Sequence, residues 1–180
     1  SETSVFYHIY PLGFCGAPPS NDDTREPQAR LNVINEWIGT MEELGVTALY
    51  LGPLFESKTH GYDTVDYRSV DRRLGTLEDL KSLIDALHSR GIRVVLDAVL
   101  NHVSRDFFAF QDVLQNLDAS PYWGWFSGLN REGSTPIGDP FTYDTWDGHY
   151  ELAKLDHSNP ELRTHLLEVV DWWIEELDID

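Results

Sequence analysis

The stretch Ile92-Arg-Val-Val-Leu-Asp-Ala-Val99 decides the fold of this chain. It is a short run dominated by β-branched and aliphatic residues, and it is the clearest strand signal in the sequence. Asp97 lies near its end, and Asn101 and His102 follow directly. Such polar groups are poorly suited to a strand exit unless they find partners. In parallel strand–helix architectures, functional side chains collect at the carboxyl ends of the strands. We therefore expect a polar cluster at this position.

Two strand–helix pairs precede this run. The nearer helix begins after Thr76, which can cap it, and Asp79 lies three residues later as a variant capping box. The strand before it, Thr47–Leu51, is apolar on both faces, as expected when helices cover both sides of a parallel sheet. The buried stripe of the helix after Thr76 is expected to be Leu77, Leu80, Leu83, Ile84 and Leu87. The other elements expected here are a strand at Val5–Tyr10 and a helix at Asn32–Leu44.

The regular alternation stops after the third strand. Residues 104–153 are rich in aromatic residues, Gly, Pro and Asp, with one helical stretch near Phe107–Leu117. We interpret them as a small inserted subdomain. A helix then begins with Asn159 as its N-cap and Pro160 in its first turn. Asp178-Ile-Asp180 has the pattern of a fourth strand. Three strands and a beginning do not close a (β/α)8 barrel, which needs eight strands and roughly 250 residues.

Composition narrows the range of functions. The 180 residues include 13 basic and 31 acidic side chains, for a formal charge of −18. This charge repels phosphate backbones and anionic lipids, which argues against nucleic-acid and membrane partners. The single cysteine, Cys15, excludes an internal disulfide. Because Ser1–Tyr10 lacks the features of a secretory signal, we expect a cytoplasmic protein, although a processed secreted form would have the same sequence.

A second polar cluster follows the second strand, in His60-Gly-Tyr-Asp-Thr-Val-Asp-Tyr67. The ring of Tyr62 offers a flat apolar face with a polar rim, which suits stacking on a pyranose, and Asp63 could accept hydrogen bonds from sugar hydroxyls. The alternative is an ordered loop in which Tyr62 packs on the core and Asp63 caps a turn. For Asp97, Asn101 and His102, the alternative is likewise turn chemistry around a satisfied buried acid.

The inserted segment carries a third group, made of aromatic residues. These side chains could line a carbohydrate groove, or they could be the core of a small subdomain. We expect most of them to be core, with one or two facing a substrate. They are Tyr122, Trp123, Trp125, Phe126, Phe141, Tyr143, Trp146 and Tyr150.

The sequence lacks the motifs of several other enzyme classes. The sequence contains no dinucleotide-binding glycine motif, no phosphate-binding P-loop, no nucleophile elbow and no paired Cys and His set for zinc. Cys15 has no evident catalytic partner, so we expect a packed or idle thiol.

In this order, the segments resemble glycoside hydrolase family 13, the α-amylase family. Phe6-Tyr-His-Ile-Tyr-Pro11 is similar to its first strand, His60–Tyr67 to a substrate-binding loop, and Asp97-x-x-x-Asn101-His102 to its first hallmark region. Within the family, the neopullulanase and cyclomaltodextrinase group is the most similar. Its insertion resembles Ser120–Phe126 and Tyr143–Thr145, and its exit resembles Leu152–Pro160, where Ala153 and Asp156 replace the usual Pro and Asn.

The resemblance implies the N-terminal portion of a (β/α)8 TIM barrel, comprising strands 1–3 and the start of strand 4, with the subdomain inserted after strand 3. Residues 1–103 would form the first part of the barrel and residues 104–153 the insertion. Residues 154–180 would then resume the barrel. The remainder of the barrel would be needed for folding and activity.

The resemblance also implies a retaining mechanism on α-glucosidic bonds, with two carboxylates about 5–5.5 Å apart. Both would lie beyond Asp180, so no catalytic residue is expected within the chain. Tyr62, Asp63, Asp97 and His102 would bind the substrate, an α-glucan oligosaccharide, with Tyr62 as the stacking platform and His102 as a hydroxyl donor. The supporting residues would be Asn101, Trp125 and Tyr143.

No cofactor would be required, but several members of the group bind calcium in the first strand–helix loop. Asn21 and Asp22 match that site, whereas Gly16 and Pro18 stand where two other ligands would be. Asn101 could serve a different calcium site.

Three functions follow as hypotheses. The first is hydrolysis of α-1,4-glucosidic bonds in maltooligosaccharides, cyclodextrins or starch-like substrates. The second is a family-13 glucosyltransferase or isomerase acting on sucrose or trehalose, which the pocket beyond the scissile bond would distinguish. The third is a non-catalytic relative that acts as a binding or scaffold module. The set Tyr62, Asp63, Asn101 and His102 argues against this third function.

Overall fold

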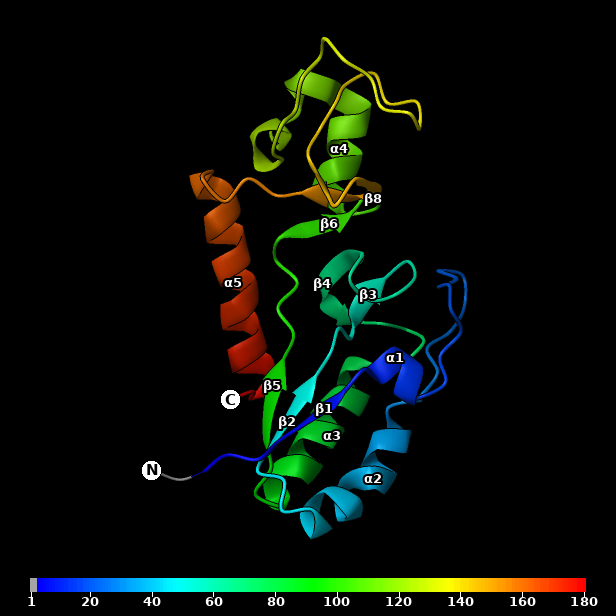
Figure 1. Ribbon diagram of the computed structural model, residues 1–180, viewed down its shortest axis with the longest axis vertical. Coiled ribbons are helices and arrows are strands. Elements are labelled where there is room, and N and C mark those ends of the chain that lie inside the picture. Colours follow the sequence, from blue (N-terminus) through cyan, green and yellow to red (C-terminus); the bar gives the residue numbers. More distant parts are fainter. Residues whose placement is uncertain (1–2) are drawn as a thin grey trace.

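The computed structural model describes residues 3–180 and contains the parallel sheet that the sequence predicts (Figure 1). Its strands are β1 (Phe6–Ile9), β2 (Ala48–Leu51) and β5 (Arg93–Leu96), in the order β1-β2-β5. The register places Ile9 beside Leu51 and Leu51 beside Leu96, so all three strands end at one edge. The third strand is shorter than expected, but the amide of Asp97 still donates to the carbonyl of Leu51 at 3.0 Å.

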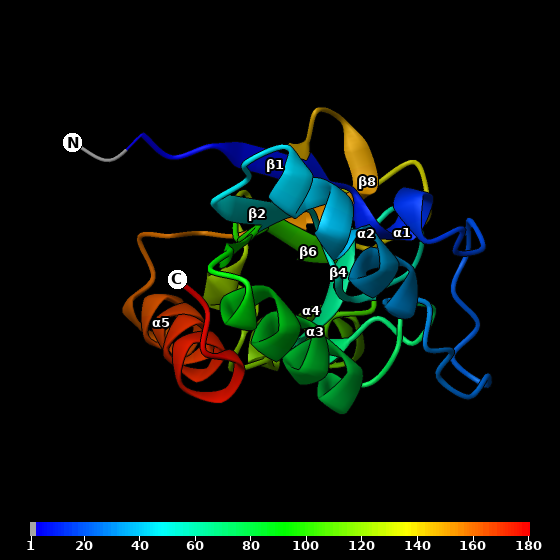
Figure 2. The same cartoon turned by 90° about the horizontal axis from the view of Figure 1, so that it is seen from below.

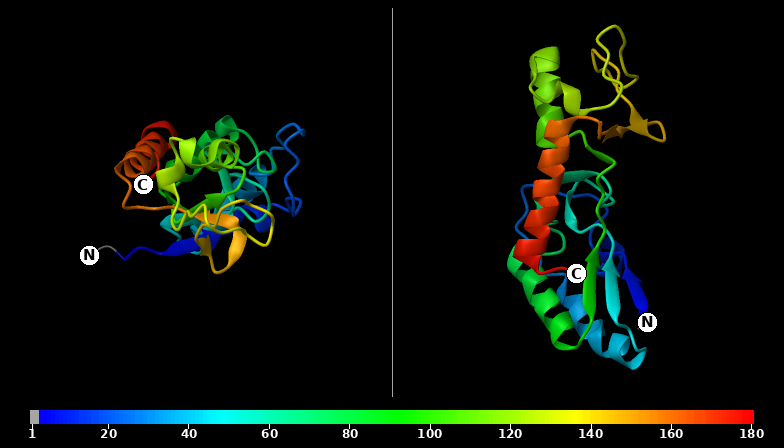
Figure 3. Two further views of the ribbon diagram at one scale, coloured as in Figure 1. Left: turned by 90° about the horizontal axis from the view of Figure 1, so that it is seen from above. Right: turned by 90° about the vertical axis from the view of Figure 1, so that its left-hand side faces the viewer.

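Helices α2 (Asn32–Glu43) and α3 (Leu77–Ser89) connect these strands. The capping box of α3 is confirmed, since Thr76 and Asp79 each bond the backbone of the other. In the described chain these helices lie on one face of the sheet, rather than on both (Figure 3, right). Seen from below, α2 lies beside β1 and β2, and α3 lies between α2 and α5 (Figure 2). The opposite face carries His8 and Tyr50, whose rings stack with centroids 4.5 Å apart.

A hairpin that the sequence analysis missed follows β2. Strands β3 (Phe55–Ser57) and β4 (Thr64–Val70) pair antiparallel, with register shifts on both sides of Glu56. The segment His60–Tyr67, which we expected to be a loop, is therefore a loop only as far as Asp63. The polar residues and irregular register of the hairpin give it no clean alternation of apolar and polar residues, which is the signal of a strand.

The segment after β5 forms a separate small layer. Strands β6 (His102–Ser104), β7 (Thr145–Trp146) and β8 (His149–Lys154) make an antiparallel sheet in the order β6-β8-β7. Helix α1 (Pro11–Phe14) lies near the parallel sheet, whereas α4 (Phe108–Asn116) and two 3-10 turns (Leu117–Ala119 and Trp123–Trp125) belong to this layer. Phe110 packs edge-on against Phe126 and Tyr143 at 5.1 and 5.0 Å. The expectation that most aromatic residues here are core is confirmed for Trp125, Phe126, Phe141 and Tyr143, which are buried.

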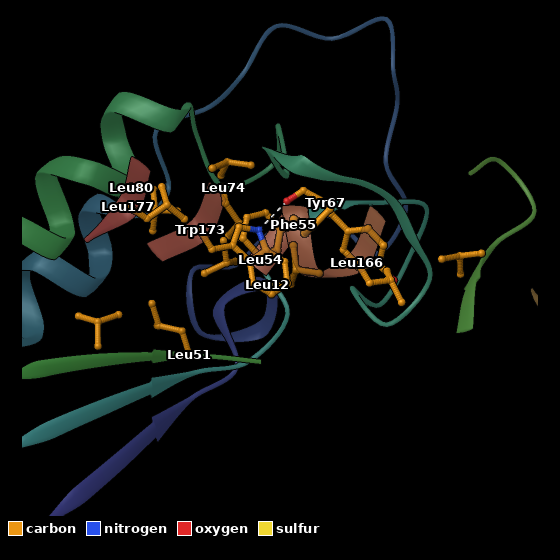
Figure 4. Close-up of a cluster of buried hydrophobic side chains, with 14 of the residues drawn as sticks. Leu12, Leu51, Leu54, Phe55, Tyr67, Leu74, Leu80, Leu166, Trp173 and Leu177 are labelled. Atoms are coloured by element: carbon orange, nitrogen blue, oxygen red, sulfur yellow. Dashed lines mark hydrogen bonds between the residues drawn. The ribbon is translucent and has the colours of Figure 1, made fainter. Parts of the chain in front are cut away.

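Helix α5 (Pro160–Leu177) begins as predicted, with the side chain of Asn159 accepting from the amides of Glu161 and Leu162. Its Trp173 ties the helix to the β3–β4 hairpin (Figure 4). The indole stacks on Phe55 at 4.7 Å, and its Nε1–H donates to the carbonyl of Tyr67 at 2.8 Å. Residues 178–180 form no strand, although the amide of Asp180 donates to Val94 in β5.

None of the helices in residues 3–180 is both long and apolar enough to span a lipid bilayer.

Replacing Trp173 with Ala should lower the free energy of unfolding of the full-length protein by about 3–5 kcal/mol, because a fully buried indole leaves a cavity. Trp173→Phe keeps the stacked ring but leaves the Tyr67 carbonyl unpaired, and should cost about 1–3 kcal/mol. Urea denaturation measures both values. Glu175→Ala, at an exposed position of the same helix, is the matched control and should change stability by no more than about 0.5 kcal/mol. Equal effects of Trp173→Ala and Glu175→Ala would contradict the importance of this contact.

Candidate functional site

A cavity of about 1000 Å³ opens between the β3–β4 hairpin and the β6-β8-β7 sheet. Three of the site residues expected from the sequence, Tyr62, Asp63 and His102, line it together. They come from two segments 40 residues apart, which the hydrogen bond of His102 with the carbonyl of Tyr62 joins. The remaining lining residues are Lys58, Thr59, His60, Ser104, Arg105, Asp106, Trp146, His149, Glu151 and Leu152.

The carboxylate of Asp63 holds the turn of the hairpin together. Its Oδ2 accepts from the hydroxyl of Thr59 at 2.7 Å, and its Oδ1 accepts from the amide of Gly61 at 3.2 Å. Gly61 has φ +92°, and a Cβ there would lie 2.9 Å from the Cβ of Pro53, so this position requires glycine. Asp63 is therefore buried and organises the loop that carries Tyr62.

The buried side chain of Arg73 also holds this loop, through a hydrogen bond to its backbone. Its guanidinium is 3% exposed and forms two bonds to Asp71, at 2.9 and 2.7 Å. It also donates to the carbonyl of Thr59 at 2.7 Å and to that of Pro18 at 3.0 Å. A bidentate guanidinium–carboxylate pair has a strongly preferred geometry, so this contact fixes the height of the loop above the sheet.

The ring of Tyr62 stands at the cavity wall and is 40% exposed. Burial of its hydroxyl, together with the charge of Asp97, raises the pKa of Tyr62 above its usual value. The phenol is therefore neutral at physiological pH and can both donate and accept a hydrogen bond.

His102 is buried between Tyr62 and Asn101. Its Nε2 lies 3.0 Å from the carbonyl of Tyr62, and its Nδ1 lies 3.1 Å from Nδ2 of Asn101. A carbonyl only accepts, so Nε2 carries the proton and Nδ1 accepts from the amide. Burial lowers the pKa of His102, which favours this neutral form. The expected role as a hydroxyl donor to sugar needs a free N–H, and in this structure that N–H is bonded to Tyr62.

Asp97 and Asn101 lie beside the cavity rather than in it. Asp97 borders a separate small crevice with Tyr67 and Val99. Burial, followed by the hydrogen bond with Asp97, raises the pKa of Tyr50. Asn101 is exposed, and its amide contacts His102.

Trp125 and Tyr143, the other expected supporting residues, lie behind the wall. Trp125 is buried between Phe108, Tyr122 and His165. The hydroxyl of Tyr143 donates to the carbonyl of Tyr150 and accepts from Arg105, each at 2.6 Å. Burial raises the pKa of Tyr143 to about 12. Tyr143 thus reaches the cavity only through Arg105.

The charged pairs of the cavity were not expected from the sequence. Arg105 makes two bonds to Asp139, at 2.8 and 2.7 Å, and Lys58 pairs with Asp106 at 2.7 Å. Burial tends to raise the pKa of Asp139, but the hydrogen bonds from Arg105 and Thr135 hold it below its usual value. The partners of Arg105 lie 34 and 38 residues away, so no local pattern could have identified them.

The two candidate calcium ligands of the first strand–helix loop, Asn21 and Asp22, differ in how their oxygens are used. Nδ2 of Asn21 donates to Glu56 and to the carbonyl of Ser57, which leaves its Oδ1, the atom that could bind calcium, buried without a hydrogen-bond partner among the described residues. The carboxylate of Asp22 accepts from the hydroxyl of Thr24 and pairs with Arg25. Across residues 3–180 no three His, Cys, Asp or Glu side chains converge as a metal site would require. Calcium takes six to eight oxygen ligands, amide and carbonyl oxygens among them, so a site here would need more oxygens than Asn21 and Asp22 supply, and calcium binding stays a prediction.

The thiol of Cys15 is buried, and this burial raises its pKa to about 11. A thiol with so high a pKa is a poor nucleophile, which agrees with a packing role.

Comparison with known proteins places this geometry in a family. Residues 8–180 match the pattern of the alpha amylase catalytic domain. The chain is 38% identical to a cyclomaltodextrinase of Thermoanaerobacter pseudethanolicus, over 98% of this chain and 33% of the relative. It is 37% identical to a maltogenic alpha-amylase of Bacillus acidopullulyticus, over 99% of this chain and 33% of the relative. The chain thus spans about a third of the length of these curated relatives.

Solved structures of similar fold belong to enzymes of the same kind. The cyclic alpha-maltosyl-(1→6)-maltose hydrolase of Arthrobacter globiformis, in complex with maltose, superposes with a TM-score of 0.81 at 36% identity, covering 98% of this chain and 43% of that one. A debranching enzyme of Nostoc punctiforme gives a TM-score of 0.82 at 34% identity, covering 96% of this chain and 40% of that one. The strand–helix units, the cavity at their carboxyl edge and these matches lead to one conclusion: the chain belongs to the α-amylase family of glycoside hydrolases, as part of its catalytic domain.

Proposed function

We propose that the full-length protein is a retaining hydrolase of α-glucans, and that this chain supplies the half of the active site that holds one glucose unit. One observation carries the proposal: the half-exposed ring of Tyr62 faces a large cavity, on a loop secured by Asp63 and His102. The names of the relatives, cyclomaltodextrinase and maltogenic alpha-amylase, support the same substrate class.

In this proposal Tyr62 stacks on the apolar face of the sugar, and its neutral hydroxyl bonds to a sugar hydroxyl. Asp63 acts through the loop, because both of its oxygens already accept bonds from that loop. His102 acts through the carbonyl of Tyr62 and fixes the backbone from which the ring projects. Asp97 contributes charge near Tyr62.

The bond-breaking carboxylates belong, in this proposal, to sequence beyond Asp180. The carboxylate of Asp180 itself accepts from the amide of Val94 at 2.8 Å and contacts His88 at 2.9 Å. It is therefore engaged at the sheet, and we assign it no role as a nucleophile. Two carboxylates at the separation of a retaining glycosidase would face the sugar that Tyr62 holds.

Charge in the cavity favours a neutral substrate. One relative, at 32% identity, is named trehalose-6-phosphate hydrolase. A phosphorylated sugar needs an available cation, whereas Arg105 and Lys58 are each paired with a carboxylate. We therefore favour unmodified α-1,4-linked glucans over a phosphorylated disaccharide. The name of another relative, intracellular maltogenic amylase of Bacillus subtilis, supports a cytoplasmic location.

The full-length protein should release reducing sugar from cyclodextrins, maltooligosaccharides and starch. Trehalose 6-phosphate should be a much poorer substrate, because it finds no unpaired cation among the cavity residues described. A reducing-sugar assay, with coupled detection of glucose 6-phosphate for the phosphorylated substrate, measures both. Faster cleavage of trehalose 6-phosphate than of any glucan would overturn the preference for neutral substrates.

Tyr62→Ala should lower kcat/KM on a cyclodextrin by roughly 100-fold or more, because a misplaced sugar loses its alignment with the reacting groups. Tyr62→Phe keeps the ring and should retain more activity than Tyr62→Ala. Steady-state kinetics on the full-length variants distinguishes the two. Unchanged kinetics in Tyr62→Ala would remove this residue from the site.

The buried, neutral His102 should make stability depend on pH in a defined direction. Its pKa in the folded protein lies below the ordinary value of 6.5, so the unfolded chain binds the proton more readily. Its stabilising contribution is complete above about pH 6.5 and is lost as the pH falls from there toward the folded pKa. In His102→Gln, whose side chain does not titrate, the fall in unfolding free energy below pH 6.5 should be shallower. It should not vanish, because burial also lowers the pKa of His165. Urea denaturation at pH 7.5, 6.5 and 5.5 tests this, and an unchanged slope in the variant would refute it.

A further inference from the structure

We propose that Trp146 and His149 form a second sugar-stacking platform, in the same cavity as Tyr62, that binds a neighbouring glucose unit of the same chain. This inference deepens the proposed function and rests on it. We call this pair of rings the outer platform.

The backbone of the β7–β8 turn brings the two rings together. Asp147 and Gly148 both have positive φ, 49° and 81°, as a tight two-residue hairpin turn of the type I′ class requires. Trp146 and His149 are then direct cross-strand partners. Such partners project to the same face of the sheet, and here the rings stack with centroids 5.9 Å apart and planes within 20°.

The outer platform faces the cavity rather than the core. Trp146 is 49% exposed, in contrast to the buried Trp125 of the same subdomain. Both rings of the outer platform, those of Trp146 and His149, line the cavity together with Glu151 from the same hairpin. Leaving an indole exposed to water costs free energy. Aromatic side chains exposed in a cavity are typical of ligand-binding sites, because a bound ligand covers them.

His102 connects the outer platform to Tyr62. The centroid of its ring lies 6.0 Å from that of Trp146, while its Nε2 bonds the carbonyl of Tyr62. The ring of Trp146 and the backbone of Tyr62 therefore lie next to the same imidazole, and both side chains line one cavity. A volume of about 1000 Å³ lies at the upper end of the range for small-molecule pockets, which leaves room for more than a single sugar ring.

The chemistry of the outer platform fits a neutral carbohydrate. Aromatic faces accept the C–H face of a pyranose, and the polar groups of His149 and Glu151 at the rim can bond its hydroxyls. The cations of the cavity, Arg105 and Lys58, are neutralised by Asp139 and Asp106. A chain of α-linked glucose units, with one ring on Tyr62 and another on the outer platform, uses both aromatic surfaces.

The test compares a substrate with one ring and a substrate with several. In the full-length protein, kcat/KM is measured for α-glucosyl fluoride and for maltotetraose. Trp146→Ala should lower the ratio of the second value to the first about tenfold, because only the longer substrate reaches the outer platform. His149→Ala should lower the ratio in the same direction by a smaller factor, and Trp146→Phe, which keeps a flat ring, should restore most of it. Ile137→Ala is the matched control, since Ile137 is 48% exposed in the same subdomain and does not line the cavity; its ratio should equal that of the wild type.

An unchanged ratio in both Trp146→Ala and His149→Ala would overturn the outer platform, as would an equal loss on both substrates. Should the wild type hydrolyse neither substrate, the proposed function fails, and calorimetric titration with maltotetraose then decides the platform separately. A Kd at least several-fold weaker in Trp146→Ala than in wild type would support it. An equal Kd, or no binding to the wild type, would refute it.

Discussion

The arrangement of this molecule depends on how one indole is buried. Trp173 of α5 stacks on Phe55 and donates its only polar hydrogen to the carbonyl of Tyr67. The hydroxyl of Tyr67 in turn donates to the carbonyl of Val99 at 2.6 Å, just beyond β5. A helix, a hairpin and the exit of a sheet strand are thereby joined through one apolar contact whose polar atoms are satisfied. Since buried polar groups are costly without partners, this geometry has few alternatives.

A buried ion pair then transmits this rigidity to the loop that carries Tyr62. Arg73 and Asp71 are both buried, and such a pair gains little net stability because both charges lose their hydration. The pair instead fixes the position and orientation of the Arg73 guanidinium. The remaining donors of Arg73 reach the carbonyls of Thr59 and Pro18, so two loops are held at a fixed distance by a single planar group. Removing either partner would leave an uncompensated buried charge.

The cavity is built from two hairpins whose turns both need unusual backbone angles. Gly61 supplies the positive φ in the first, and Asp147 with Gly148 supplies it in the second. Each turn presents an aromatic ring, Tyr62 or Trp146, on backbone that is held by hydrogen bonds or strand pairing. A site made in this way holds its aromatic surfaces in place before a ligand arrives, which lowers the entropic cost of binding. The cations that line it, Arg105 and Lys58, are each paired with a carboxylate, which agrees with the proposed neutral ligand.

The sequence by itself determined the local elements and the identity of the polar strand exits. Helical spacing and the caps at Thr76 and Asn159 defined α3 and α5, and the apolar runs defined the three parallel strands. The motif around Tyr62 and Asp63, and the polar exit at His102, identified the cavity wall. These signals are local, because propensity, capping and periodicity act over a few residues.

Only the tertiary structure decided what those residues touch. It committed the Nε2–H of His102 to Tyr62, 40 residues away, placed Trp125 and Tyr143 behind the wall, and brought Trp146 into the cavity. It also turned a polar segment into the β3–β4 hairpin, which has no clean alternation to reveal it. The physical reason is the same in each case. The partner of a side chain is set by packing between segments that are distant in the sequence, and the local spacing of residues does not predict that partner.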